Sequence, residues 1–229
     1  MTDPRPPTPR FTPALGFRSL TAAYDLAIAL ATREGIWRRR MLAALTATPG
    51  QTVVDIGAGT GSFALMLARQ RPGVRIVAID PDPAVRAIAE RKFARAGIAI
   101  DYVTAGGEDA PAAITPGSID WVTISLVLHQ CPQAVKQAIL HNAFALLREG
   151  GRLLISDYGV QRGPRARLGF QLVRLLDGFE NTRANMAGML PTIMKAAGFA
   201  EVREEIATPT PSGDISLYSG MKGRHRREG

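Results

Sequence analysis

A glycine-rich segment between Val53 and Gly61 has the residue types and spacing of a turn that binds a ligand. An apolar run, Val53 to Ile56, leads directly into Gly57-Ala58-Gly59-Thr60-Gly61. Glycine allows positive φ and a close approach of backbone to ligand, and a helix starting after the turn presents free N–H groups to it. We therefore expect a polar, flat ligand at this turn.

A carboxylate follows at the distance expected for the next strand of a βα unit. Asp80 lies nineteen residues beyond Gly61, at the end of a second apolar run. At that place a carboxylate can accept hydrogen bonds from both ribose hydroxyls of an adenosine. A glycine turn alone is weak evidence, but a strand, a turn and a distal carboxylate in register indicate an adenosine-containing cofactor.

Two classes of cofactor use this arrangement, and Asp55 distinguishes between them. Dinucleotide enzymes favour G-x-G-x-x-G, in which the helix terminus holds a pyrophosphate, whereas this chain has G-x-G-x-G preceded by Asp55. A carboxylate so close would repel a pyrophosphate, but it can orient the positively charged amino group of a methionine moiety, directly or through water. The pattern favours S-adenosyl-L-methionine, with S-adenosyl-L-homocysteine as product, and we expect no metal.

Several segments resemble, in order and spacing, the motifs of class I S-adenosylmethionine-dependent methyltransferases. The subgroup that the chain resembles is the one around the ubiquinone and menaquinone biosynthesis methyltransferases, over about residues 20 to 222. The resemblance implies methyl transfer to a small-molecule or lipid-like acceptor. The matching segments are 20–25 (Leu-Thr-Ala-Ala-Tyr-Asp), 55–61, Asp80, 118–122, 126–129, 147–153 and 197–199.

The resemblance also implies a role for individual residues. The glycines of the turn would contact the methionine part, Asp80 would hold the ribose, and Leu126 with the backbone after Ser125 would line the sulfonium end. The family usually has Gly-Asp-Ala at the adenine pocket, where this chain has Gly-Gly-Glu-Asp at 106–109, so the carboxylate that reaches the adenine stays open. The expected cofactor residues are Asp55, Gly57, Ala58, Gly59, Gly61, Asp80, Pro81, Gly107, Glu108, Asp109, Ser125 and Leu126.

The methyl-transfer end needs little acid–base chemistry. An in-line displacement at a sulfonium methyl depends mainly on holding nucleophile and methyl about 3 Å apart. A carbon or hydroxyl nucleophile would still benefit from a group with a pKa near the working pH. His129 is the first candidate for this catalytic role and Tyr24 the second, although a buried, hydrogen-bonded structural histidine is the alternative. Asp157 and Tyr158, at the end of the fifth expected strand, are candidates for the acceptor pocket.

These residues need a scaffold of alternating strands and helices, and the pattern from residue 51 onward predicts one. We expect an α/β, Rossmann-like sheet of seven mostly parallel strands with the last strand antiparallel, and helices on both faces. Asp82, Pro83 and Gly97 give one helix a clear start and stop. Strands are expected at 52–56, 74–79, 99–103, 119–124, 152–156, 201–207 and 215–221, and helices from about 60, at 82–97, from 132 to 150, at 165–178 and at 182–197.

The domain organisation is a single methyltransferase domain with additions. A flexible proline-rich arm at 1–18 precedes the domain at 19–222, and a disordered basic tail follows at 223–229. The domain includes an N-terminal helical cap at 19–47 and a helical insertion at 162–185. Within the cap, apolar periodicity predicts a helix over 19–45, which Gly35 kinks or divides.

The composition narrows the class of partner. The chain has 229 residues, 46% of them hydrophobic, and a formal net charge of +8, which fits either an anionic partner or an ordinary solvated basic surface. Trp37 followed by Arg38, Arg39 and Arg40 suggests a helix lying on an anionic membrane surface. A single cysteine, Cys131, and the lack of a signal or membrane-spanning stretch lead us to expect a cytoplasmic protein, in peripheral contact with the membrane if that helix binds it.

Alternative functions stay open at this stage. A phospholipid N-methyltransferase working at a membrane surface is the nearest one, and a non-catalytic S-adenosylmethionine-binding regulator is one of another class. Nucleic acid is disfavoured as a partner, because the chain lacks an Asn-Pro-Pro-Tyr motif and Cys131 lies outside any base-methylating nucleophile motif. The acceptor and the oligomeric state remain open.

Overall fold

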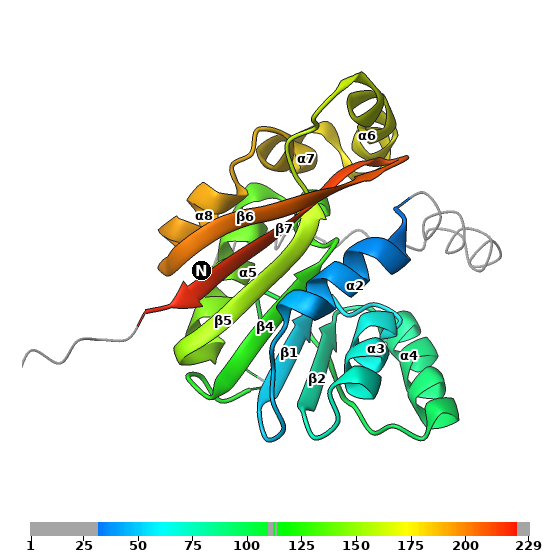
Figure 1. Ribbon diagram of the computed structural model, residues 1–229, viewed down its shortest axis with the longest axis vertical. Helices are drawn as coiled ribbons and strands as arrows, with labels where there is room; N and C mark the ends of the chain where they lie inside the picture. Colours follow the sequence, from blue (N-terminus) through cyan, green and yellow to red (C-terminus); the bar gives the residue numbers. More distant parts are fainter. Residues whose placement is uncertain (1–31, 110–111, 113, 224–229) are drawn as a thin grey trace, which may run out of the picture.

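The computed structural model describes residues 32–109, 112 and 114–223. Their centre is one seven-stranded sheet with the strand order β3-β2-β1-β4-β5-β7-β6 (Figure 1). Pairing is parallel from β3 through β5, while β7 is antiparallel to both β5 and β6. The expected sheet, mostly parallel with an antiparallel last strand, is confirmed. The strands are β1 (Thr52–Ile56), β2 (Arg75–Asp80), β3 (Asp101–Thr104), β4 (Ile119–Ser125), β5 (Leu147–Tyr158), β6 (Phe199–Thr210) and β7 (Gly213–Lys222).

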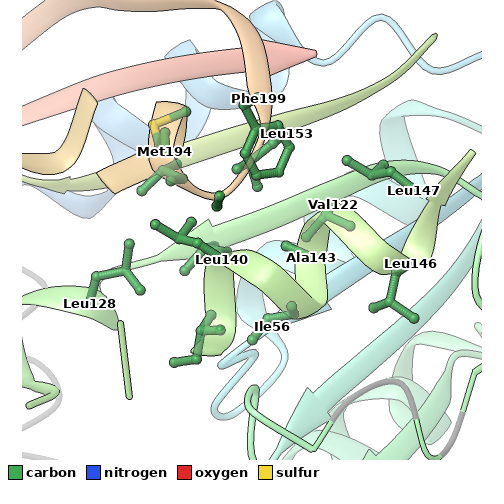
Figure 2. Close-up of a cluster of buried hydrophobic side chains, with 14 of the residues drawn as sticks. Ile56, Val122, Leu128, Leu140, Ala143, Leu146, Leu147, Leu153, Met194 and Phe199 are labelled. Atoms are coloured by element: carbon green, nitrogen blue, oxygen red, sulfur yellow. The ribbon is translucent and has the colours of Figure 1, made fainter. Parts of the chain in front are cut away.

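Helices cover both faces of the sheet (Figure 1). One apolar cluster joins a face of the sheet to α2, α3, α4 and α6, and a second cluster joins the other face to α5, α7 and α8. Figure 2 shows the second cluster, in which Leu140 and Ala143 of α5 lie on the same side of the sheet as Met194 of α8, with Ala143 next to Val122 of β4. The helices are α2 (Glu34–Ala44), α3 (Ser62–Gln70), α4 (Pro83–Ala96), α5 (Gln133–Leu146), α6 (Pro164–Asp177), α7 (Phe179–Met186) and α8 (Leu190–Ala196), with a short 3-10 turn, η2, at Leu128–Gln130. None of the helices described is both long and apolar enough to cross a membrane.

The helix with the clearest sequence signals forms as expected. The Asp82 side chain accepts a 2.7 Å hydrogen bond from the amide of Ala84, and Pro83 occupies the first turn of α4. Gly97 ends the helix in the left-handed conformation at φ 65°. These local signals fix the position of Asp80, which lies immediately before the helix start.

Two expected helix boundaries are wrong. The helix from 132 ends at Leu146 instead of Gly150, because Leu147 is already extended and pairs with Ile119 in the sheet. Gly150, at φ 74°, lies inside β5, where the pairing with β4 shifts register. The expected helix 182–197 is two helices, α7 and α8, separated at Gly188 (φ 68°) and restarted by Pro191.

The N-terminal helical cap is described only in its second half. Residues 19–31 lie outside the described part, and Gly35 lies in the first turn of α2 without dividing it. Trp37 is 2% exposed and packs in the core. Arg38 pairs with Glu34 at 3.2 Å, and Arg40 donates a 2.8 Å hydrogen bond to the hydroxyl of Thr208. Within the described part of the cap, α2 therefore does not present Trp37 to a membrane as expected, because this side chain covers the sheet.

Candidate cofactor and acceptor site

The glycine turn follows β1 and is held against the end of β2. The amides of Gly57 and Ala58 donate to the carbonyl of Ile79 at 2.8 and 3.0 Å. Gly59 has a positive φ of 53°, and no heavy atom beyond its chain neighbours lies within 4 Å of the position that a Cβ would take there. At Gly57, in contrast, a Cβ would overlap the side chain of Val127. The open side of the turn is therefore at Gly59, where a ligand can approach the backbone.

Asp80 connects the turn to the second strand. One carboxylate oxygen accepts a 2.9 Å hydrogen bond from the amide of Gly59, and the other accepts one of 3.0 Å from the amide of Asp82. The side chain is partly buried, and burial raises the pKa of Asp80 above its ordinary value. A carboxylate oxygen has two acceptor sites, so each oxygen can accept a further hydrogen bond from a ligand hydroxyl. Both the position and the bonding capacity suit a ribose.

Asp55 is fully buried inside β1 and has an unsatisfied oxygen. Oδ1 accepts a 2.7 Å hydrogen bond from the hydroxyl of Thr123, whereas Oδ2 has no partner among the described residues. Burial raises the pKa of Asp55 to about 7, while the hydrogen bond from Thr123 lowers it. A buried polar atom without a partner calls for an explanation. A cationic amino group of a ligand, or a water between the two, would supply one, so this residue fits S-adenosylmethionine.

Two residues that the sequence analysis missed support the turn from outside. The hydroxyl of Tyr102 on β3 donates a 2.6 Å hydrogen bond to the carbonyl of Gly59. The ammonium of Lys92 on α4 donates to the carbonyl of Thr60 at 3.0 Å and to the hydroxyl of Ser62 at 2.7 Å. Neither residue belongs to a motif, because each reaches the turn from a different element. These bonds hold the carbonyls of the turn away from its open side.

The expected adenine segment lies after β3. Gly107 is buried, whereas Glu108 and Asp109 are exposed. The amide of Asn142 on α5 donates to the carbonyls of Gly107, at 3.3 Å, and of Glu108. Asn142 is a further positioning residue without a sequence signal of its own. Pro81, directly after Asp80, is half-buried at the same edge of the sheet.

The end of β4 reaches the glycine turn. Ser125 and Leu126 are both half-buried, and Leu126 has a positive φ of 53°, which is uncommon for a bulky residue. The amide of Leu126 donates a 2.9 Å hydrogen bond to the carbonyl of Ser156 in β5. Val127 then packs against Gly57. The structure thus brings the expected sulfonium-end residues beside the expected methionine-binding turn, and a strained backbone fixes their place.

His129 lies between two carboxylates at the end of the sheet. Its Nδ1 is 2.8 Å from Asp157 and its Nε2 is 3.3 Å from Asp177, and the residue is 6% exposed. Burial alone would lower the pKa of His129, but the charges of Asp157 and Asp177 and the hydrogen bonds to them raise it to about 9. The ring therefore carries both protons at neutral pH. A general base needs an unprotonated nitrogen that can accept a proton. This environment therefore suits a positioning residue better than the general base that we expected.

Asp157 is the centre of this arrangement. It is fully buried and accepts hydrogen bonds from the amides of Leu128, at 2.7 Å, and of Tyr158, at 2.7 Å. The ring of Tyr158 contacts that of His129 edge-on at 4.9 Å. Asp157 and Tyr158 are thus interior residues at this edge, not side chains that project into open space. Tyr24, the second expected catalytic residue, lies outside the described residues.

The comparisons with known proteins agree with this geometry. Residues 53–151 match the family model described as a methyltransferase domain. The chain is 27% identical to a demethylmenaquinone methyltransferase of Clavibacter sepedonicus, over 91% of this chain and 90% of that protein. The chain is an S-adenosylmethionine-dependent methyltransferase, and it has the class I fold. The expected likeness of this methyltransferase to the quinone biosynthesis group is confirmed, and its cofactor is S-adenosylmethionine.

Solved methyltransferase structures share the fold. An O-methyltransferase family protein from Burkholderia thailandensis superposes with a TM-score of 0.71 at 17% identity, over 91% of this chain and 62% of that one. Phosphoethanolamine N-methyltransferase 2 of Haemonchus contortus, in complex with S-adenosyl-L-methionine, superposes with a TM-score of 0.65 at 17% identity. That alignment covers 88% of the methyltransferase described here and 53% of the Haemonchus chain. The chain thus spans about half the length of that structural relative, and at this identity the likeness concerns the fold alone.

Proposed function

We propose that this methyltransferase transfers the methyl group to a lipophilic aromatic acceptor of the phenol or quinol type. The observation that carries the proposal is the location of the protein's exposed apolar side chains. Among the described residues, all eight large hydrophobic side chains that are exposed fall between residues 160 and 189. They are Val160, Leu168, Leu172, Leu175, Leu176, Phe179, Met186 and Met189.

The position of these side chains supports the proposal. Segment 160–189 follows the carboxyl end of β5, and the glycine turn follows the carboxyl end of β1, so both lie at the same edge of the parallel strands (Figure 1). Ligands of open α/β sheets bind at this edge. Met186 is the last residue of α7, Met189 follows it, and Val160 lies against Gly188 between them. Helix α7 contacts η2, which begins two residues after Leu126. Apolar and adaptable methionine side chains suit a greasy ring. The Clavibacter relative, a demethylmenaquinone methyltransferase by name, agrees with an acceptor of this kind.

In the proposed mechanism the protein binds and orients the cofactor and the acceptor, and it exchanges no proton with either. Asp80 would accept hydrogen bonds from the ribose, Gly59 would admit the ligand to the backbone, and Asp55 would face the amino group. The bound cofactor supplies a methyl group on a sulfonium. Leu126 would line that end, and the imidazolium of His129, through Asp157, holds the 126–129 segment against β5. An acceptor that is already a phenolate needs no base, which fits a histidine that keeps both protons at neutral pH.

An acceptor screen tests this proposal. Purified protein is incubated with methyl-labelled S-adenosylmethionine and three acceptor classes: short-chain naphthoquinols and phenols, phosphoethanolamine, and a nonmethylated peptide. We expect label in the quinol or phenol class only. Labelling of phosphoethanolamine alone would favour the phospholipid alternative and contradict the proposal.

A further inference from the structure

Helix α6 carries apolar side chains on two opposite faces. Phe170 and Val173 point into the core, at 0% and 9% exposure. Leu168, Leu172, Leu175 and Leu176 are 76, 62, 66 and 66% exposed, and their spacing of three and four residues places them together on the other side of the helix. We call these four residues the leucine face. A surface helix of a globular protein normally has a polar outer side, so a continuous apolar outer face indicates a partner.

The leucine face is held rigidly in its outward orientation. Gly169 lies so close to the β6–β7 hairpin that an added Cβ would overlap the carbonyl of Pro211. On the inner side, the ring of Phe170 lies 4.9 Å from that of Tyr158. Figure 1 shows α6 beside the tip of this hairpin, beyond the end of the sheet. Because the inner side is fixed by packing, α6 cannot rotate to bury its leucines.

The surroundings of the leucine face are basic. Between residues 160 and 189 there are five arginines and two acidic residues, and one of the acids, Asp177, is engaged by His129. A hollow of about 690 Å³ lies at the start of α6, between this helix and the hairpin, and Arg33, Arg162 and Arg165 line it together with one acid, Asp214. Arg162 pairs with Glu204 at 2.7 Å. Arg165 has no ion-pair partner within the part of the chain that the structure describes. Positive groups thus border an apolar surface.

We propose that α6 binds an anionic lipid surface, with the leucine face among the acyl chains and the bordering arginines at the headgroups. This combination of an apolar face with a basic border is the physical signature of an interfacial helix. A second copy of the chain fits less well, because a two-fold contact would bring two like-charged borders together. Residues 1–31 are also a less suitable partner for the leucine face and its basic border. They carry three arginines and two aspartates, and so they offer no excess of negative charge.

Lipid contact at α6 would also explain how a greasy acceptor reaches the site, and this consequence rests on the proposed function. The leucine face and the glycine turn lie at the same edge of the sheet, so an acceptor dissolved in the lipid would meet the protein beside its cofactor. The lipid contact itself is independent of the acceptor. It can therefore be tested without acceptor or cofactor.

The experiment is cosedimentation of the full chain with vesicles of phosphatidylcholine alone or with one quarter phosphatidylglycerol, at 50 and 500 mM salt. We expect binding to the anionic vesicles that weakens steeply with salt. The double variant Leu172→Glu/Leu176→Glu should weaken partitioning by at least about tenfold. The double variant Arg165→Gln/Arg167→Gln, at two exposed arginines in the first turn of α6, should weaken it by about fivefold for each arginine. The matched control, Arg91→Gln/Arg95→Gln, removes the same charge from exposed positions on α4 and should stay within about twofold.

Three outcomes would overturn the proposal. The first is absence of wild-type binding to anionic vesicles at 50 mM salt. The second is a dimer in sedimentation equilibrium that Leu172→Glu/Leu176→Glu dissociates, which would assign the leucine face to a second copy. The third is a fall of several degrees in Tm for that variant without vesicle binding, which would mean that the rest of the chain covers the leucines. Turnover of a soluble acceptor is measured separately, so failure of the acceptor proposal would not be mistaken for failure of this one.

Discussion

Asp80 and Gly59 are joined by a 2.9 Å hydrogen bond from the glycine amide to a carboxylate oxygen, across twenty-one residues of chain. The other oxygen of Asp80 accepts from Asp82 at the start of α4. One side chain thus sets the distance between the glycine turn and the end of β2, the two places where we propose that the methionine part and the ribose bind. A change at Asp80 will therefore affect both the contact with ligand and the shape of the turn.

Asp80→Ala should weaken binding of S-adenosylhomocysteine by about tenfold to several hundredfold. The reason is the loss of charge-assisted hydrogen bonds worth roughly 1.5 to 3 kcal/mol each, which are not fully additive. Calorimetry gives the dissociation constant. Asp101→Ala is the matched control, since Asp101 is an exposed carboxylate on β3 that pairs with Arg75. Unchanged affinity in Asp80→Ala would remove this residue from the cofactor site.

Comparing Gly59→Ala with Gly97→Ala distinguishes a block to ligand binding from the cost of a strained backbone. Gly59 and Gly97 both have positive φ, at 53° and 65°, and both have open space where a Cβ would be. Each alanine should therefore lower the free energy of unfolding by a similar amount, about 1 kcal/mol. Only Gly59→Ala should also weaken S-adenosylhomocysteine binding, by at least about tenfold, because the new methyl group fills the open side of the turn. Equal affinities in the two variants would contradict our placement of the cofactor.

The parts of the fold that could be predicted are those with local signals. Asp82, Pro83 and Gly97 define α4 within a few residues of chain, and the glycine spacing defines the turn. The boundary at Leu147 could not be predicted, because pairing with Ile119 overrides the stop signal of Gly150. Secondary structure there depends on a contact that is distant in sequence.

The same holds for the site: residues in short motifs could be predicted, and contacts between distant elements could not. The cofactor residues come in short motifs, whereas the contacts of His129 come from β5 and from the end of α6, which no local pattern connects. The exposure of the leucines of α6 could not be predicted either. Their helical period indicates an amphipathic helix, but period alone does not show that Phe170 and Val173 form the buried face and the leucines the exposed one.

Lys136 illustrates a buried charge that holds an element in place. It is 0% exposed, and its ammonium donates to the carbonyl of Asn181 at 2.5 Å and to the side-chain oxygen of Asn185 at 2.8 Å, joining α5 to α7. Burial lowers the pKa of Lys136. Lys136→Met should lower the free energy of unfolding by about 1 to 3 kcal/mol, because two buried acceptors lose their donor.

Hydrogen exchange locates this effect. Amides of residues 179–186 should exchange faster in Lys136→Met, since α7 loses its link to α5. Lys195→Met, an exposed lysine on α8, is the control and should leave exchange unchanged. Stability equal to that of wild type, with normal protection of α7, would show that the buried ammonium contributes nothing net.

The ion pairs of His129 predict how stability changes with pH. A group whose pKa is raised in the folded state holds its proton more tightly there, so its contribution is complete below the unfolded value and is lost as pH rises through the folded value. For His129 these values are 6.5 and about 9, which places the loss between pH 6.5 and 9 and makes it on the order of 3 kcal/mol. Asp55, with a pKa raised from 3.8 to about 7, also lowers stability as pH rises, but mainly between pH 4 and 7.

The two pH windows allow the contribution of His129 to be measured by itself. Urea unfolding at pH 6, 7, 8 and 9 should show wild-type stability falling up to pH 9, and between pH 8 and 9, well above the pKa of Asp55, nearly all of the slope should come from His129. His129→Gln should be less stable at pH 6, because Asp157 stays buried with one bond fewer, and its stability should change little between pH 8 and 9. His141→Gln, at an exposed histidine on α5, should keep the wild-type slope. A slope in His129→Gln as steep as in wild type would mean that the imidazole is neutral in the folded protein. The ring would then have a nitrogen able to accept a proton, and the catalytic role expected from the sequence would stand.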